Sequence, residues 1–284
     1  MSGRRRRSSR DIFLGIDFSG SPSQWQQRPA ASAVWIAQIT GHEKPALADL
    51  RRVQDLPGDA PPFERLAALL RAGDFSIAGI DAPFSPPAGY FAGTRAALLK
   101  AVRALPCSGR PFATGGQLVA LLAPELAPRG RHAHRATEQV WRRRRINVRS
   151  VLWNGPRGGA PFAAACMTLI AQCGLPAWPW CSPATRPLLV ETFPAAQLRT
   201  WDLPWFGYNG SAPAARRRRE SIVSAVVKKT GLSLTKSYRR TLAASADALD
   251  SVLCALAARA VASGALAEPP GETAAQEGWI VVHR

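Results

Sequence analysis

Five acidic side chains lie in largely apolar parts of the sequence, where a carboxylate is costly to bury. They are Asp17, Asp81, Glu191, Asp247 and Asp250. A buried carboxylate needs a counter-charge or a bound cation. Carboxylates that converge repel one another, and Mg²⁺ or Mn²⁺, which prefer oxygen ligands, would relieve that repulsion. Such a site could support displacement at phosphorus, with one ion activating water and a second stabilising the leaving oxygen.

Each of these acids also has a purely structural interpretation. Asp17 and Asp81 precede turns, where an acid commonly caps backbone amides. Asp247 could complement the positive end of a helix, an explanation that weakens for Asp250, which lies deeper in the same helix. Glu191 could pair with one of the many arginines.

The elements that would position these acids can be read from the apolar pattern. Runs that end in an acid predict buried strands over 12–17, 75–81 and 188–191. An alanine-rich helix is predicted over 244–263, and the three-residue spacing of Asp247 and Asp250 places both on one face of it. The sequence leaves open which of the two faces a metal.

The remaining elements complete a mixed architecture. Further strands are expected over 31–39, 47–56 and 278–282. Turn residues between the first three strands favour antiparallel hairpins. Helices are expected over 62–72, 94–104, 116–122, 136–145, 161–173, 194–198 and 213–229. This order predicts one α/β domain over 11–284, with a helical insertion at about 84–186, between the fourth and fifth strands, packed as a cap.

Positive charge is concentrated in short runs. The chain has 37 basic and 19 acidic residues, a net charge of +18, and twelve of the basic residues form the runs Arg4–Arg7, Arg142–Arg145 and Arg216–Arg219. Without the runs the excess falls to +6, so the charge is patchy, as expected of a protein that binds phosphate backbones. The alternative is a set of solvated arginines. The nucleic-acid-binding candidates are Arg142, Arg143, Arg144, Arg145, Arg216 and Arg217.

The cysteine content and the apolar pattern also indicate the cellular compartment. Five scattered cysteines without a CxxC pair argue against disulfides or structural zinc and favour a reducing environment. The start of the chain does not match a signal peptide, and no apolar run reaches the ~18 residues of a membrane span. We therefore expect a cytoplasmic protein with no membrane partner and a disordered basic tail over residues 1–10. The oligomeric state stays open.

Two further groups of residues have weaker functional interpretations. His132 and His134 form an H-x-H pattern that could ligate a metal, although a solvated loop is the commoner setting. Aromatic residues flank the basic runs and could stack on unpaired bases or pack beneath a loop. These are Trp178, Trp180, Trp201, Trp205, Phe206 and Tyr208.

Five short motifs occur in an order that resembles a known family. They are Gly15-Ile16-Asp17, Ile80-Asp81-Ala82-Pro83, Glu191-Thr192-Phe193-Pro194-Ala195, Asp247-Ala248-Leu249-Asp250-Ser251 and Glu277-Gly278-Trp279-Ile280. From about residue 12 to the C-terminus the chain resembles the domain-of-unknown-function family 429 (DUF429), whose members are regarded as predicted nucleases of the RNase H-like fold.

The resemblance implies an RNase H-like, five-stranded mixed sheet and a set of metal-binding acids. Asp17 on the first strand, Asp81 at the end of the fourth and Asp247 or Asp250 from the last long helix would bind Mg²⁺ or Mn²⁺. Glu191 matches an acid-then-proline motif of the family. A further arginine and acid of the inserted region match Arg135 and Glu138, which could equally be an ordinary surface ion pair.

These observations predict a metal-dependent nuclease or phosphodiesterase that acts on nucleic acid through its carboxylate cluster. The main alternative is a nucleic-acid-binding protein whose acids only support the fold. An ATPase of the actin and sugar-kinase type is a weaker alternative, because the sequence has no second such domain and no glycine-rich phosphate loop.

Overall fold

The computed structural model describes residues 12–29 and 34–284, so the expected tail over 1–10, with Arg4–Arg7, lies outside the described residues. One mixed sheet has the strand order β3-β2-β1-β4-β5-β6. The strands are β1 (Ile12–Asp17), β2 (Trp35–Thr40), β3 (Ala46–Arg52), β4 (Ile77–Ile80), β5 (Leu188–Thr192) and β6 (Ile280–Val281). The first three are antiparallel neighbours, as expected, whereas β1, β4, β5 and β6 run parallel. The mixed α/β class is confirmed, and the described residues form the six strands that the apolar pattern predicted, where the family resemblance implied five.

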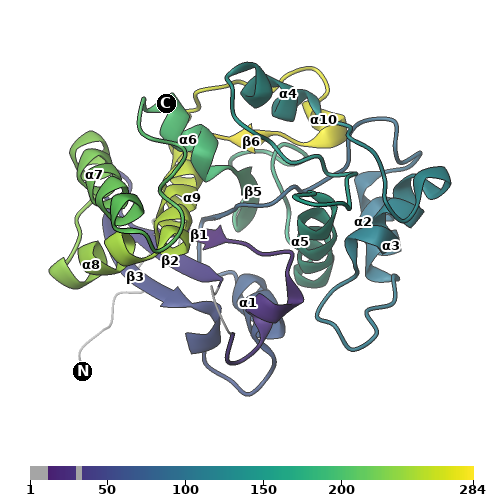
Figure 1. The fold of residues 1–284 in the computed structure, drawn as a ribbon, viewed down its shortest axis with the longest axis horizontal. Coiled ribbons are helices and arrows are strands. Elements are labelled where there is room, and N and C mark those ends of the chain that lie inside the picture. Colours follow the sequence, from purple (N-terminus) through teal and green to yellow (C-terminus); the bar gives the residue numbers. More distant parts are fainter. Residues whose placement is uncertain (1–11, 30–33) are drawn as a thin grey trace.

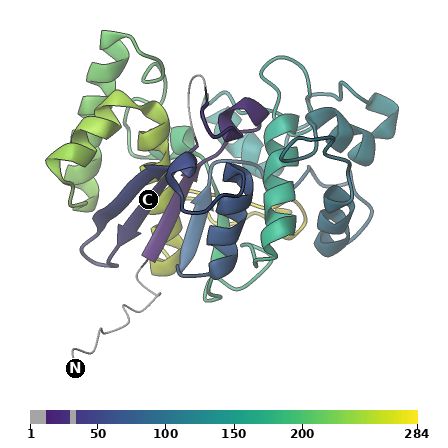
Figure 2. The same cartoon turned by 90° about the horizontal axis from the view of Figure 1, so that it is seen from below.

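Helices cover both faces of this sheet (Figures 1 and 2). One face carries α6 (Pro194–Thr200), α7 (Pro213–Thr230), α8 (Lys236–Ala244) and α9 (Ala246–Ser263). The other carries α1 (Pro62–Ala72) and α5 (Ala160–Cys173). Strand residues alternate between two cores: Phe13 and Ile77 pack on the α9 side, and Leu14 and Ala78 on the α1 and α5 side. The face that a strand residue occupies therefore follows from its position along the strand.

Two glycines allow α9 to lie against the sheet. A Cβ atom at Gly15 would come within 1.9 Å of the Ser251 carbonyl oxygen, and one at Gly79 within 2.4 Å of the Cys254 carbonyl oxygen. No side chain fits in either place, so the helix backbone rests directly on β1 and β4. Each glycine lies two residues before an aspartate, Asp17 or Asp81. The close approach thus brings α9 to the strand ends that carry the acids.

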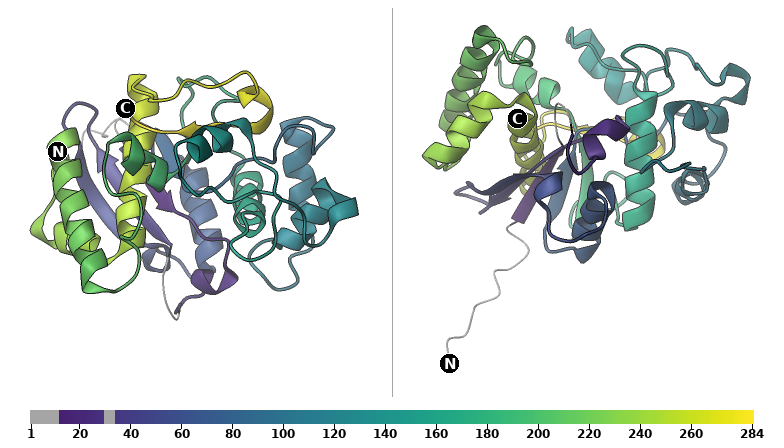
Figure 3. Two further views of the ribbon diagram at one scale, coloured as in Figure 1. Left: turned by 45° about the horizontal axis from the view of Figure 1, so that its top comes forward. Right: turned by 60° about the horizontal axis from the view of Figure 1, so that its bottom comes forward.

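Four α-helices lie between β4 and β5 along the chain, together with one short 3₁₀ helix. The α-helices are α2 (Arg95–Arg103), α3 (Gly115–Leu122), α4 (Ala136–Arg143) and α5. α2 and α3 pack on the outer side of α5 through Leu98, Leu118 and Met167 (Figure 3). α5 itself packs on the sheet beside α1. The expectation that this whole segment forms a separate cap is therefore wrong for α5, whose apolar face completes the core.

Several boundaries differ from the sequence-based expectations. Residues 53–55 form the 3₁₀ helix η3 (Val53–Asp55) instead of continuing β3. The expected helix over 244–263 begins at Ala246, because Ser245 breaks from α8 and caps α9 by accepting a hydrogen bond from the Ala248 N–H at 3.1 Å. Helices α8 and α10 (Ala274–Glu277) were not expected. The other two short helices are η2 (Pro22–Trp25) and η4 (Pro124–Leu126).

Within residues 12–29 and 34–284, no single helix is long and apolar enough to cross a membrane; α8 and α9 meet that criterion only as a pair bent by 115°.

Candidate functional site

Asp17 and Asp81 lie side by side at the carboxyl ends of two parallel strands. β1 and β4 pair with Ile16 opposite Ile80, and the Asp81 N–H donates to the Ile16 carbonyl at 3.0 Å. Asp17 is two residues beyond Gly15, which faces α9, so its side chain belongs to the same face of the sheet. Parallel pairing has thus brought together two acids that are 64 positions apart in the sequence.

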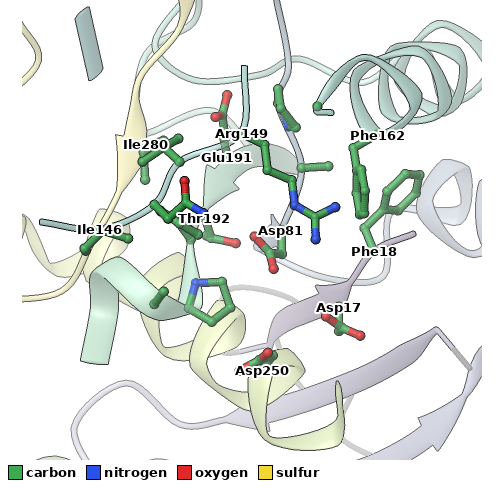
Figure 4. A pocket seen from close by; sticks show the side chains of 18 of the residues that line it. Asp17, Phe18, Asp81, Ile146, Arg149, Phe162, Glu191, Thr192, Asp250 and Ile280 are labelled. Carbon is green, nitrogen blue, oxygen red and sulfur yellow. The ribbon is translucent and has the colours of Figure 1, made fainter. Parts of the chain in front are cut away.

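α9 adds Asp250 and Asp247 to the same place. All four aspartates line one cavity of about 620 Å³, and each is partly accessible from it. Figure 4 shows Asp17, Asp81 and Asp250 around the floor of this cavity, carried by β1, the end of β4 and α9. The three-residue spacing in α9 therefore places both helix acids on the cavity side, as the sequence predicted.

The carboxylates destabilise one another's charged forms. Burial and the neighbouring carboxylates Asp250, Asp247 and Asp81 raise the pKa of Asp17 well above its usual value. Burial and the charges of Asp81 and Asp247 likewise raise the pKa of Asp250. For Asp81, burial raises the pKa to about 7, with the positive charge of Arg149 acting in the opposite direction. Burial also raises the pKa of Asp247. Such shifts are typical of functional sites.

Tyr208 fixes the position of Asp250. Its hydroxyl donates to Asp250 Oδ1 at 2.9 Å, and the tyrosine side chain is buried. The loop that carries Tyr208 is held in turn by Arg219, whose guanidinium donates to the carbonyls of Tyr208, Gly210 and Ala243. The last residue of the run Arg216–Arg219 therefore faces inward and orders the site instead of binding an external partner.

Arg149 places a positive charge beside the acids. Its guanidinium carbon lies 4.8 Å from the centre of the Phe162 ring. Figure 4 shows the guanidinium between that ring and Asp81, pointing into the cavity. Arg149 is exposed, so the charge is open to a ligand. No local pattern in the sequence marks this residue, because only tertiary packing brings it to the cavity.

Glu191 lies on the opposite face of the sheet from the aspartates. Its neighbours Leu188 and Val190 pack on the α9 side, whereas Leu189 packs on the α5 side, and alternation places Glu191 with Leu189. Both of its oxygens accept hydrogen bonds from Arg135, one of them at 2.7 Å. Burial raises the pKa of Glu191 and the Arg135 charge opposes that rise. The alternative that Glu191 pairs with an arginine is therefore confirmed.

The pair of Arg135 and Glu138 is buried, each side chain being about 1% exposed, so it is not the surface ion pair that the spacing also allowed. Arg135 Nε donates to Glu138 at 2.9 Å. Arg135 Nη1 also donates to the Glu277 carbonyl at 3.2 Å. The Glu277 carboxylate accepts from the N–H groups of Ala88 and Ala136. This network joins β5, α4 and α10, and Arg135, Glu138 and Glu191 line the same cavity as the aspartates.

The chemistry of the aspartates suits a hard divalent cation. Across residues 12–29 and 34–284, no three histidine, cysteine or acidic side chains lie close enough together to hold an ion as they stand. Asp17, Asp81 and Asp250 nevertheless offer only oxygen donors, and a cation between them would offset the repulsion that raises the pKa values of Asp17 and Asp250. The predicted Mg²⁺ or Mn²⁺ site stays a prediction, and it requires these side chains to draw closer together.

The arginines predicted to bind nucleic acid have different surroundings in the structure. Arg145 lines the cavity, and Arg144 pairs with Glu268. Arg142 and Arg143 are exposed on α4 and line a shallow depression beside His134. On α7, Arg216 pairs with Glu220 at 3.2 Å, and Arg217 is exposed. Nucleic-acid binding by the six candidate arginines stays a prediction.

The H-x-H histidines have other partners. The His132 ring stacks on Trp153 with 4.6 Å between centres, and His134 Nδ1 lies 3.5 Å from Glu138. Neither residue lines the carboxylate cavity.

Comparison with known proteins identifies a family. Residues 15–275 match the family model described as "Protein of unknown function (DUF429)". No curated protein and no solved structure matches the chain.

Proposed function

The chain belongs to DUF429, a family of proteins of unknown function, and we propose that it is a metal-dependent phosphodiesterase that cleaves nucleic acid. One observation carries the proposal. Asp17, Asp81 and Asp250 converge from three elements in one cavity, with pKa values raised by burial and, for Asp17 and Asp250, by mutual repulsion. Acids that only supported the fold would be expected to have partners that lower their pKa values.

The three aspartates would hold Mg²⁺ or Mn²⁺. When bound, the cation supplies an activated water and neutralises charge on the phosphoryl oxygens. Asp17 and Asp81 are fixed by the pairing of β1 with β4, and Asp250 by the Tyr208 hydroxyl. This preorganisation limits the movement that coordination requires of the ligands.

Arg149 and Asp247 have separate roles in this proposal. Arg149 binds a non-bridging oxygen of the substrate phosphate and stabilises the charge that develops there, since its guanidinium faces the cavity and is exposed. Asp247 lies about one helical turn before Asp250 on the cavity side and accepts a proton from the attacking water, a role that its raised pKa favours.

Glu191 acts as a positioning residue. Its Oε2 accepts a hydrogen bond from the Phe84 N–H at 3.0 Å, which holds the chain that follows Asp81. Arg135 compensates the buried charge of Glu191, and Glu138 compensates that of Arg135. The three residues form part of the cavity wall and act on the site through the turn that follows Asp81.

The proposal extends to the fold and the cellular setting. We assign the chain to the RNase H-like fold, with about 84–186 as a helical insertion into a single domain over 11–284. The mixed sheet, with acids at the carboxyl ends of β1 and β4, supports this assignment. All five cysteines are free, which supports a reducing compartment such as the cytoplasm.

The test is hydrolysis of bis(p-nitrophenyl) phosphate in the presence of Mn²⁺. We expect activity from the wild type and a loss of at least about 100-fold in Asp81→Asn, because a metal ligand is removed. Asp74→Asn is the matched control, since Asp74 is exposed and does not line the cavity. Binding of nucleic acid should survive Asp81→Asn.

Equal rates for the wild type and Asp81→Asn would show that the activity does not arise from this site. A wild type that binds nucleic acid and hydrolyses no phosphodiester would favour the alternative of a binding protein whose acids only support the fold.

A further inference from the structure

The mouth of the carboxylate cavity carries an exposed aromatic side chain. Phe206 is 64% exposed, and no other large apolar side chain within residues 12–29 and 34–284 is exposed to solvent in this way. It lines the same cavity as the aspartates, next to the half-buried Trp205. The two rings meet edge to face with 5.3 Å between centres. A ligand that covered this phenyl ring would remove apolar surface from water, which is favourable.

Arginines accompany both rings. The Arg218 guanidinium lies 5.7 Å from the centre of the Phe206 ring, and Arg218 Nη1 donates to the Phe206 carbonyl at 2.9 Å. The Arg199 guanidinium lies 4.3 Å from the Trp205 ring, and its contact with the exposed Asp202 is long, at 3.8 Å. An aromatic surface edged by cations matches a nucleotide, which offers a flat base and an anionic phosphate.

The same loop connects this surface to the carboxylates. Tyr208, two residues after Phe206, holds Asp250 through its hydroxyl, and Arg219 fixes the loop backbone at Tyr208 and Gly210. A base placed on the Phe206 ring would therefore lie at a defined position relative to Asp250. The loop that carries the stacking surface is thus the same loop that positions Asp250.

We propose that Phe206 and Trp205 form a stacking platform for an unpaired base, with Arg218 contacting the adjacent phosphate, and that the substrate is single-stranded nucleic acid. In a duplex both faces of a base are covered by its neighbours, so an exposed ring could not stack on it without unpairing. A cavity of about 620 Å³ is also of the size that accepts a small molecule or one nucleotide. The inference rests on the proposed function for the cleavage site, but binding to the platform requires no metal.

The test is fluorescence anisotropy with a labelled oligothymidylate and a labelled duplex of the same length, both in EDTA to prevent cleavage. Stacking on one aromatic ring contributes about 1–3 kcal/mol per base, so Phe206→Ala should weaken single-strand binding by about 5- to 150-fold. Phe206→Trp should retain affinity, because indole offers a larger stacking face. Arg240→Ala is the charge control for Arg218→Ala, because Arg240 is exposed on α8 and does not line the cavity.

The inference is supported if Phe206→Ala weakens binding of the single strand and leaves that of the duplex unchanged, and if Arg218→Ala weakens it more than Arg240→Ala. Unchanged single-strand affinity in Phe206→Ala overturns it, as does an equal loss for duplex and single strand. Because the assay contains no metal, its result is independent of hydrolysis of bis(p-nitrophenyl) phosphate. A platform that binds single strands in a protein without hydrolytic activity would refute the proposed function alone.

Discussion

Replacing Asp81 by asparagine should stabilise the metal-free protein at neutral pH, although it removes a proposed metal ligand. The Asp81 carboxylate is charged at pH 8 in a buried setting beside other acids, and burial raises its pKa to about 7 from the usual 3.8. Asparagine has nearly the same shape and no charge. The substitution also removes a repulsion that raises the pKa values of Asp17 and Asp250.

The sign and size of this effect follow from proton linkage. Between pH 3.8 and about 7 the folded state binds more protons at Asp81 than the unfolded state does, so wild-type stability falls as the pH rises through this range. The full shift in the pKa of Asp81, from 3.8 to about 7, corresponds to about 4 kcal/mol of unfolding free energy, because one pKa unit is about 1.4 kcal/mol. Asp81 is partly exposed and solvent screens its charge, so we expect Asp81→Asn to be more stable than the wild type by about 2–4 kcal/mol at pH 8. At pH 4 the difference should be close to zero.

Urea denaturation in EDTA measures this difference at pH 4, 6 and 8. Asp74→Asn is the control for the loss of one negative charge from a protein of net charge +18. A lower stability of Asp81→Asn than of the wild type at pH 8, or a difference that does not grow with pH, would refute the buried charge as the cause. An equal gain in Asp74→Asn would show that net charge, and not the cavity, is the cause.

Three further variants test other parts of the account. Tyr208→Phe should lower Mn²⁺ affinity by about 10- to 100-fold in calorimetric titration, because Asp250 loses the group that orients it, and unchanged affinity would exclude this role. Gly15→Ala should destabilise the fold by about 1–3 kcal/mol or more in urea denaturation, because the new Cβ meets α9 backbone, and wild-type stability would contradict the close packing. Arg135→Ala should cost about 3–5 kcal/mol by leaving the buried Glu191 charge unpaired, and a much smaller loss would refute the buried ion pair.

Much of the fold could be predicted because its elements have strong local signals. Pro62 and Gly73 bound α1, and the apolar run ending at Asp17 fixed β1. The break at Ser245 was missed, since alanine and leucine continue on both sides and only the cap on Ala248 shows that a new helix begins. α8 was missed because its sequence is short and largely polar.

Part of the site could be predicted, because strand ends and strand register determine where its acids lie. Asp17 and Asp81 were found because each follows an apolar strand, and parallel strands bring their carboxyl ends together. Glu191 has the same local pattern but falls on the other face, which one residue of strand register decides. Arg149 and the hydroxyl of Tyr208 come from loops without periodic sequence, so only the tertiary structure reveals their roles.

The most direct test of the central claim is anomalous diffraction from crystals of the protein soaked in Mn²⁺. We expect a manganese peak about 2.0–2.3 Å from carboxylate oxygens of Asp17, Asp81 and Asp250, and loss of that peak in Asp81→Asn. A manganese peak found only outside this cavity would contradict a metal site built from these acids. So would the absence of a peak in the cavity at Mn²⁺ concentrations that raise the melting temperature of the protein in solution.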